Sequence, residues 1–154
     1  MKSIKDVLSD IQGKRVYFDT NPIIYYLEQV QPFYEIACPF FESIGMSEIQ
    51  AYTSEFTLAE ILIKPMRENT IPLIQDIKDF ILDPDLISLT KTHRELFLKA
   101  AEFGGQYGLR SADSIHFVSA IENHCHFFVT NDKKFKSQSG TQVIILNDYL
   151  EETN

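Results

Sequence analysis

Short apolar runs alternate with longer amphipathic stretches along most of the chain. The runs have the length and the β-branched and aromatic content typical of strands, and the stretches between them carry apolar residues at helical spacing. Strands separated by helices predict βαβ units and a mainly parallel sheet, which indicates an α/β protein. The predicted strands span residues 15–18, 49–53, 86–89, 126–129 and 143–146.

Prolines and small polar residues mark the expected limits of the helices. The first helix that follows a strand is expected to begin near Pro22, with Thr20 or Asn21 as its N-cap. Pro39 should kink or split its helix, and Pro65 should interrupt another, because proline lacks the N–H that continues the hydrogen-bond ladder. The predicted helices span residues 1–13, 22–27, 32–46, 54–63, 72–82, 92–107 and 111–123.

The chain has the bulk properties of one domain. Its 154 residues are 44% apolar, and no repeat or linker divides them. No apolar run reaches the about 18 residues of a membrane span, and the N-terminus lacks the apolar segment of a signal peptide. Cys38 and Cys125 lie in apolar surroundings without CxxC spacing, which indicates buried free thiols in a reducing compartment. We therefore expect a single soluble, cytoplasmic domain over residues 1–154, with no membrane partner.

Four carboxylates stand at related points of the predicted fold. Asp19 directly follows the first strand, and Asp132 closely follows the fourth strand. Glu60 lies in the first turn of the helix after the second strand, and Asp113 lies in the first turns of the helix before the fourth strand. Open α/β sheets place their ligands at the carboxyl ends of the strands, so we expect these side chains to converge there.

Each carboxylate also has a structural explanation. Asp19 could cap a strand end, Thr57-x-x-Glu60 is a capping-box pattern, Asp113 could balance a helix dipole, and Asp132 could form a turn or start a helix. Taken together, however, four acids at one edge would repel strongly without a cation. Hard divalent ions take oxygen ligands, so the set is typical of metal-assisted phosphoryl chemistry.

Four segments, in this order, resemble the signature segments of PIN-domain nucleases: Phe18-Asp19-Thr20-Asn21, Thr57-x-x-Glu60, Leu109-x3-Asp113-x2-His116-x3-Ala120 and Thr130-Asn131-Asp132-x2-Phe135. The resemblance covers residues 15–147. It implies a three-layer α/β/α fold with a five-stranded parallel sheet in the order 3-2-1-4-5. It also implies a metal-dependent ribonuclease of the kind found as VapC-type toxins. The additional N-terminal helix at 1–13 departs from the family pattern.

The resemblance also implies roles for residues. Mg²⁺ or Mn²⁺ held by Asp19, Asp113 and Asp132 would polarise a phosphodiester and activate the attacking water, leaving a 5′-phosphate and a 3′-hydroxyl. Glu60 would bind metal or orient that water. The predicted residues that orient the carboxylates are Asn21, Thr130, Asn131 and His116, although His116 could equally serve helix packing.

Charge is distributed unevenly around these acids. The net charge of −8, from 22 acidic and 14 basic residues, argues against coating nucleic acid by bulk electrostatics, but a local patch remains open. Ion pairing and solubility are the ordinary roles of surface cations. Our hypothesis is instead a basic rim that receives RNA phosphates. The six basic residues that flank the acids are Lys64, Arg67, Arg110, Lys133, Lys134 and Lys136.

Three functions remain open from the sequence. The first is an endoribonuclease toxin, which would form a homodimer by resemblance and whose antitoxin would insert Arg or Lys between the carboxylates. The second is an RNA-processing PIN nuclease without an antitoxin. The third is a catalytically weak RNA-binding or scaffold module. A phosphatase of the haloacid dehalogenase type is disfavoured, because it needs a second aspartate where Asn21 stands.

Overall fold

Five parallel strands form one sheet in the order β3-β2-β1-β4-β5 in the computed structural model, which describes residues 1–153. The predicted α/β fold and strand order are therefore confirmed. In the centre of the sheet, Val16 of β1 lies opposite Ala51 of β2 on one side and Phe127 of β4 on the other. The strands are β1 (Arg15–Phe18), β2 (Gln50–Ser54), β3 (Ile87–Thr90), β4 (Phe127–Thr130) and β5 (Gln142–Ile145).

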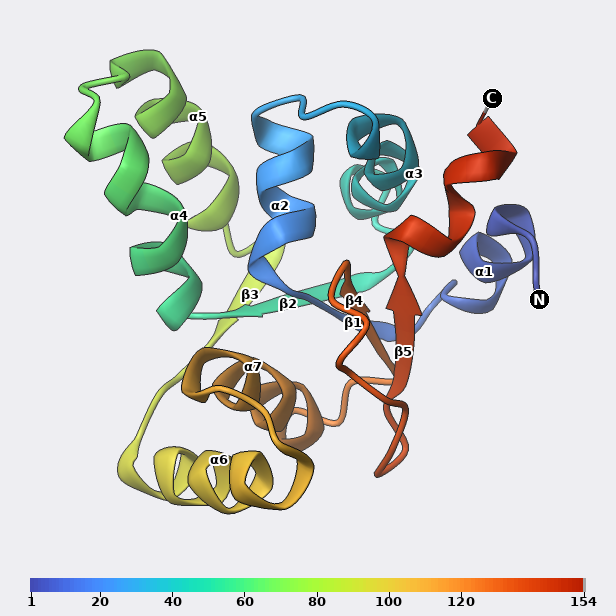
Figure 1. The fold of residues 1–154 in the computed structure, drawn as a ribbon. Coiled ribbons are helices and arrows are strands. Elements are labelled where there is room, and N and C mark those ends of the chain that lie inside the picture. Colours follow the sequence, from blue (N-terminus) through green and yellow to red (C-terminus); the bar gives the residue numbers. More distant parts are fainter. Residues whose placement is uncertain (154) are drawn as a thin grey trace.

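Helices cover both faces of this sheet. Figure 1 shows α2 to α5 above the strands and α6 with α7 below them, while α1 and the C-terminal helix η1 lie near each other beyond β5. Within residues 1–153, no helix is long and apolar enough to cross a membrane. The helices are α1 (Ile4–Asp10), α2 (Thr20–Leu27), α3 (Phe33–Gly45), α4 (Phe56–Arg67), α5 (Ile71–Ile81), α6 (Arg94–Tyr107), α7 (Ser111–Glu122) and η1 (Leu146–Thr153).

Neither proline ends its helix, so the predicted split at Pro39 and the predicted interruption at Pro65 are wrong. Pro39 lies inside α3 and Pro65 lies inside α4, and both helices continue past them. Each proline removes one backbone donor, whereas burial of an apolar face stabilises the whole helix. Phe40 and Phe41 beside Pro39 are buried, as is Pro65 itself. Tertiary packing therefore outweighs the local preference.

The start of α2 also differs from the prediction. The helix begins at Thr20, and its N-cap is Asp19 rather than Thr20 or Asn21. Asp19 has an extended backbone, and its side chain accepts a hydrogen bond from the Thr20 N–H. Asp19 thus turns the chain from the end of β1 into α2, and its position is fixed by two elements at once.

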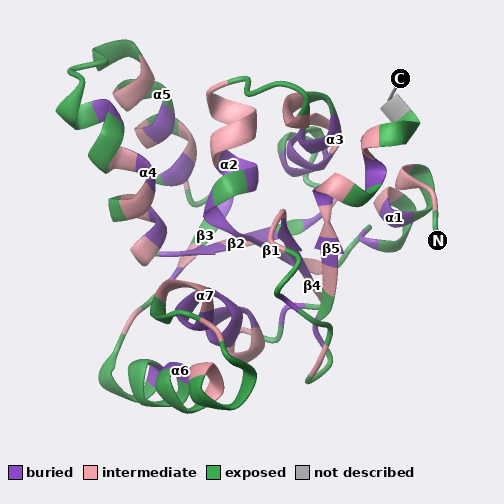
Figure 2. Cartoon of the chain, in the orientation of Figure 1, coloured by how far each residue is buried: buried purple, intermediate pink, exposed green. Residues whose placement is uncertain are grey.

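The sheet is buried on both faces, as Figure 2 shows for the central strands. Val16 and Phe18 belong to the large core between the sheet and helices α2 and α3. Tyr17, which lies between them in the sequence, belongs to the core on the other face of the sheet, next to α7. There the Tyr17 ring stacks on Phe128 of β4, with ring centroids 5.3 Å apart. Because both faces of β1 are packed in this way, the position of Asp19, which directly follows the strand, is well defined.

Helix α6 approaches α7 closely at one glycine. A Cβ atom on Gly104 would lie 2.6 Å from the Ser114 hydroxyl oxygen and 2.9 Å from the Leu109 carbonyl oxygen. The Ser114 hydroxyl already donates a 2.9 Å hydrogen bond to the Arg110 carbonyl, so it is not free to move away. Gly104 therefore sets how closely α6 supports the first turn of α7.

We expect Gly104→Ala to lower the free energy of unfolding. Overpacking costs about 1–3 kcal/mol, which exceeds the about 0.5–1 kcal/mol by which alanine stabilises a helix relative to glycine. Gly105→Ala is the matched control, since a Cβ there meets no atom within 4 Å. This control should be neutral or stabilising. Urea unfolding of both variants tests the prediction, and equal midpoints would contradict it.

Candidate active site

Asp19 lies at the carboxyl end of β1, beside the end of β4. It is 8% exposed, and its two oxygens have different partners. Oδ1 accepts from the Thr20 backbone N–H at 2.8 Å, and Oδ2 accepts from the Thr130 hydroxyl at 2.8 Å. Because β1 and β4 are neighbours in the sheet, Thr130 reaches Asp19 directly from the last residue of its strand. Thr130 was predicted to orient the carboxylates, and this hydrogen bond is consistent with that role, which stays a prediction.

Glu60 is held toward Asp19 from α4. Its Oε1 accepts a 2.8 Å hydrogen bond from the Thr20 hydroxyl and lies 2.5 Å from His116 Nε2. The capping-box explanation of Glu60 is wrong, because α4 begins at Phe56 and the hydroxyl of Thr57 bonds to that of Thr53. Oε1 makes both bonds, and within residues 1–153 no hydrogen bond uses Glu60 Oε2.

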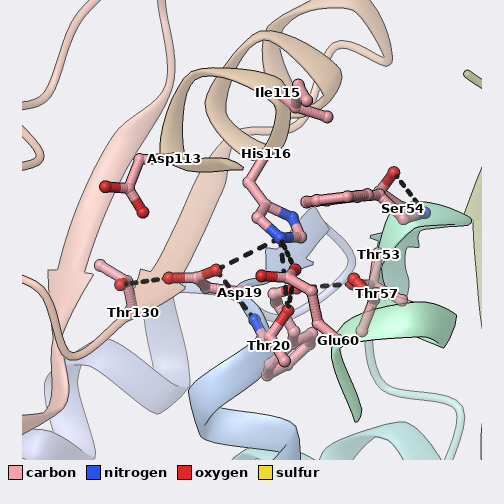
Figure 3. Close-up of polar contacts among 12 residues, drawn as sticks. Asp19, Thr20, Thr53, Ser54, Thr57, Glu60, Asp113, Ile115, His116 and Thr130 are labelled. Carbon is pink, nitrogen blue, oxygen red and sulfur yellow. Dashed lines mark hydrogen bonds and ion pairs between the residues drawn. The ribbon is translucent and has the colours of Figure 1, made fainter. Parts of the chain in front are cut away.

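His116 is the centre of this group, as Figure 3 shows. The imidazole is almost completely buried, with Nε2 between Glu60 and Asp19 and 3.8 Å from Asp19 Oδ1. Its other nitrogen, Nδ1, forms a 2.8 Å hydrogen bond with the Tyr17 hydroxyl. Tyr17 belongs to the same strand that carries Asp19, so β1 positions both the carboxylate and the residue that orients the imidazole.

Burial and charge act in opposite directions on these groups. Burial alone would lower the pKa of His116, but the hydrogen bond to Glu60 and the nearby carboxylates raise it. Burial favours a higher pKa of Glu60, and the bond and charge of His116 reverse this, so the pKa of Glu60 is lowered. For Asp19 burial prevails, and its pKa is raised despite His116 and Thr130. The arrangement therefore favours an imidazolium between two carboxylates.

Asp113 lies on α7, one turn before His116, and faces the same region in Figure 3 without a contact to the residues drawn. Its Oδ2 is buried and has no hydrogen-bond partner within residues 1–153. Arg110 Nε lies 3.6 Å from this oxygen, on a side chain that is 77% exposed. A buried carboxylate oxygen without a donor is costly, so this atom is suited to a cation.

Asp132 forms a turn after β4. Its Oδ1 accepts from the Lys134 N–H at 2.9 Å, and its own N–H donates to the Thr130 hydroxyl at 3.1 Å. Thr130 therefore connects the backbone of Asp132 with the carboxylate of Asp19. Among the described residues, no direct contact joins the Asp132 carboxylate to Asp19, Glu60 or Asp113. Within residues 1–153, no group of three or more His, Cys, Asp or Glu side chains is already arranged to hold a metal ion.

The other predicted site residues are two asparagines, expected to orient the carboxylates, and six basic residues, expected to bind RNA. Asn21 is exposed, while Asn131 donates to the Tyr25 hydroxyl and accepts from the Asn147 N–H. Within residues 1–153 neither asparagine is hydrogen-bonded to a predicted carboxylate, so their orienting role stays a prediction. The basic residues predicted for RNA are all exposed: Lys64, Arg67, Arg110, Lys133, Lys134 and Lys136.

Two contacts of the site were not predicted from the sequence. Thr20 was expected only as a cap, but its hydroxyl bonds Glu60. Tyr17 was assigned only to a strand, yet its hydroxyl bonds His116. A tyrosine within an otherwise apolar central strand is a signal that could have been used, because a buried phenol needs a polar partner.

A sequence profile described as PIN domain matches residues 16–140, which is most of the chain. The chain belongs to the PIN domain family. Members of this family are generally nucleases that use divalent metal ions. Helix α1 lies before the matched residues, and its status as an addition to the family fold stays a prediction.

Two solved structures have the same fold. A toxin–antitoxin complex from Klebsiella pneumoniae has a TM-score of 0.63 at 17% identity, covering 85% of this chain and 97% of that chain. VapBC2 from Rickettsia felis, bound to a DNA fragment from its promoter, has a TM-score of 0.65 at 18% identity, covering 85% and 98%. No curated protein matches the sequence. At these identities the likeness establishes the fold.

We expect Tyr17→Phe to lower the free energy of unfolding by about 1–3 kcal/mol, because it leaves a buried ring nitrogen of His116 without a partner. The ring that stacks on Phe128 is retained. Tyr52→Phe is the matched control on the adjacent strand, since the Tyr52 hydroxyl makes no hydrogen bond in the described part of the chain. Urea unfolding should separate the two variants, and equal losses would remove the special role of the Tyr17 hydroxyl.

Proposed function

We propose that this PIN domain is a divalent-metal-dependent endoribonuclease that acts as the toxin of a toxin–antitoxin pair. The observation that carries the proposal is the buried Asp113 Oδ2, which lacks a hydrogen-bond partner among residues 1–153 and lies on the helix that also carries His116. Asp113 lies in the first turn of α7, where an acid also favours the helix dipole. That role does not require an oxygen buried without a hydrogen-bond donor among residues 1–153, so this oxygen is suited to a cation. Family membership supports a nuclease, and the two structural relatives support the toxin assignment.

The donor set fits Mg²⁺ or Mn²⁺. Asp19, Asp113 and Asp132 offer the carboxylate oxygens that hard cations prefer, and Glu60 has one oxygen that makes no hydrogen bond within the described residues. These residues would hold the metal. When bound, the metal would polarise the phosphodiester and lower the pKa of a water molecule. The family's general use of divalent ions is consistent with this assignment.

The protein residues around the metal ligands supply orientation. Thr130 fixes one oxygen of Asp19, which leaves the direction of that carboxylate determined before any ligand arrives. Thr20 and His116 together hold one oxygen of Glu60. With His116 protonated, part of the negative charge of the site is compensated inside the protein. Pre-oriented groups of this kind reduce the reorganisation that the reaction would otherwise need.

RNA would approach across the basic rim defined above. Arg110 and the lysines at 133, 134 and 136 are exposed next to Asp113 and Asp132, so phosphates can be received beside the acidic residues. Lys64 and Arg67 lie on the exposed part of α4, beyond Glu60. A strand bound in this way would place a phosphodiester between the cations and the carboxylates.

The same acidic residues are suited to inhibition by a basic partner. An antitoxin that inserts an Arg or Lys side chain would pair with Asp19, Glu60 or Asp113 and occupy the place of the metal. The relatives from Klebsiella pneumoniae and Rickettsia felis are themselves in complexes that include an antitoxin. We further propose that the chain forms a homodimer and acts in the cytoplasm.

We expect the wild-type protein to cleave end-labelled single-stranded RNA with Mg²⁺ or Mn²⁺ and not with EDTA. Asp113→Asn should reduce the rate by at least about 100-fold, because loss of groups that merely support metal ligands already costs about 10–100-fold. The rates are measured by gel electrophoresis of the labelled products, whose ends should be 5′-phosphate and 3′-hydroxyl.

Asp76→Asn is the matched control, since Asp76 is an exposed acid on α5 and the substitution removes the same charge. Its rate should equal that of the wild type. Cleavage that survives Asp113→Asn would indicate a wrong site or a contaminating nuclease. Folded protein that binds RNA but cuts with neither metal would favour the RNA-binding module.

We also expect Mn²⁺ to stabilise the wild-type protein in the absence of RNA. An ion at 100 times its dissociation constant should raise Tm by about 5–10 °C, from about 2.7 kcal/mol of stabilisation. Asp113→Asn should lose most of this shift, whereas Asp76→Asn should keep it. Differential scanning fluorimetry measures all three proteins, and equal shifts would exclude Asp113 as a ligand.

A further inference from the structure

A hollow at the end of α6 contains none of the four predicted carboxylates, but two lysines of the basic rim line it. Its volume is about 280 Å³, and it is enclosed between the end of α6 and the segment from 134 to 138. Tyr107, Leu109 and Phe117 line one side of it, and Lys134, Phe135 and Lys136 line the other. In Figure 1 this segment descends from β4 beside the α6 and α7 pair before it returns to β5.

The segment that carries the two lysines is well anchored. Phe135 is 3% exposed and packs on Phe117 and Phe128, with ring centroids 5.6 and 4.8 Å apart. Because the Phe135 side chain points inward, Lys134 and Lys136 on either side of it are exposed. Gln138 and Thr141 exchange two backbone hydrogen bonds of 3.0 and 2.9 Å, which close the loop. The lysines are therefore held at the edge of a built cavity.

Tyr107 provides an aromatic wall. It is the last residue of α6, because Gly108 follows in the left-handed conformation with φ of 69° and ends the helix. Tyr107 remains 47% exposed even though its ring packs at 4.6 Å from that of Phe103. A half-exposed aromatic ring that lines the same hollow as two lysines is a combination that proteins use for single-stranded nucleic acids, with bases stacked on the ring and phosphates on the cations.

Both walls of the cavity continue into the acidic site. Leu109 lines the cavity, and the next residue, Arg110, lies 3.6 Å from Asp113. On the other wall, the Lys134 N–H donates to the Asp132 carboxylate at 2.9 Å. A strand with a phosphodiester at these carboxylates would therefore pass the cavity within the adjoining nucleotides.

We propose that this cavity is a nucleobase subsite, in which one base of single-stranded RNA stacks on Tyr107 while Lys134 and Lys136 contact the flanking phosphates. This rests on the proposed function only in taking RNA as the substrate. The volume lies just below the about 300 Å³ at which small-molecule sites begin, so it suits one flat base. A larger hollow of about 480 Å³ between α6 and α7 suits RNA less, because none of its lining residues in the described chain is charged.

The test is RNA binding by the full chain in EDTA, which separates binding from cleavage. The probe is a short fluorescein-labelled single-stranded RNA, and affinity is measured by fluorescence anisotropy. Tyr107→Ala should weaken binding about 5-fold or more, the loss typical of one stacked base, whereas Tyr107→Phe should stay within about twofold of the wild type. Unfolding curves of the variants show whether the fold is retained.

An abasic scan shows whether a base is the occupant. Each nucleotide is replaced in turn by an abasic one, and at one position the wild type should lose the same factor that Tyr107→Ala loses. At that position the variant should lose nothing further. Lys134→Ala and Lys136→Ala should each reduce the slope of log affinity against log salt by about 0.7, and Lys5→Ala on α1 should leave it unchanged.

The outcomes separate this subsite from the proposed function. RNA cleavage with unchanged affinity of Tyr107→Ala would overturn the subsite and leave the nuclease in place. The predicted binding pattern without cleavage under any metal would support the subsite and overturn the nuclease. If Tyr107→Ala binds RNA normally but no longer self-associates in sedimentation, the cavity is a contact between copies of the chain. A wild type that binds no RNA overturns both.

Discussion

The site depends on one buried imidazole. His116 lies between the carboxylates of Glu60 and Asp19, and its far nitrogen is bonded to the Tyr17 hydroxyl. Without a positive charge at this point, two acids would face each other in a region of low polarity, where repulsion is only weakly screened. The raised pKa of His116 and the lowered pKa of Glu60 are two expressions of the same attraction. The charges of Asp19 and Asp113 also raise the pKa of His116, but this attraction compensates them only in part. Burial still raises the pKa of Asp19, and one oxygen of Asp113 has no hydrogen-bond partner in the described chain.

The fold brings these groups together through a small number of close contacts. Pairing of β1 with β4 places Thr130 against Asp19, and the alternation along β1 sends Tyr17 to the opposite face, toward α7. Helix α7 can carry both His116 and Asp113 over the sheet because Gly104 lets α6 support it without a side chain in between. A change at this helix contact would therefore be transmitted to the acids, although none of them touches Gly104. Stability and geometry of the site are coupled through packing.

Local patterns predicted the strands and, through the family resemblance, their order in the sheet, and they failed where a contact between residues distant in the sequence determines the structure. The convergence of all four acids stays a prediction. The strands were recognisable because buried parallel strands are continuous apolar runs, and Asp19 follows one of them directly. Thr57 and Glu60 match a capping box, which would make Thr57 the N-cap. Helix α4 instead begins at Phe56, whose N–H donates to the Ser54 hydroxyl, so Thr57 lies inside the helix. The bond between Tyr17 and His116 joins residues 99 positions apart, so no local spacing encodes it. The turn at Asp132, in contrast, was among the predicted alternatives. Its hydrogen bond joins residues only two positions apart, so a local pattern can encode it.

The charge distribution constrains how the proposed RNA substrate could be bound. A chain with net charge −8 repels a polyanion at long range, while the exposed lysines at 134 and 136 attract phosphates over a few ångströms. Salt screens the first effect beyond about 8–10 Å and weakens the second as well, so affinity cannot rest on bulk electrostatics. In the proposed complex it would come from short-range contacts, such as stacking of a base on the aromatic ring of Tyr107 and contacts of the phosphates with nearby cations. Under the proposed function, the RNA would therefore be selected by the subsites that it fills and not by general charge attraction.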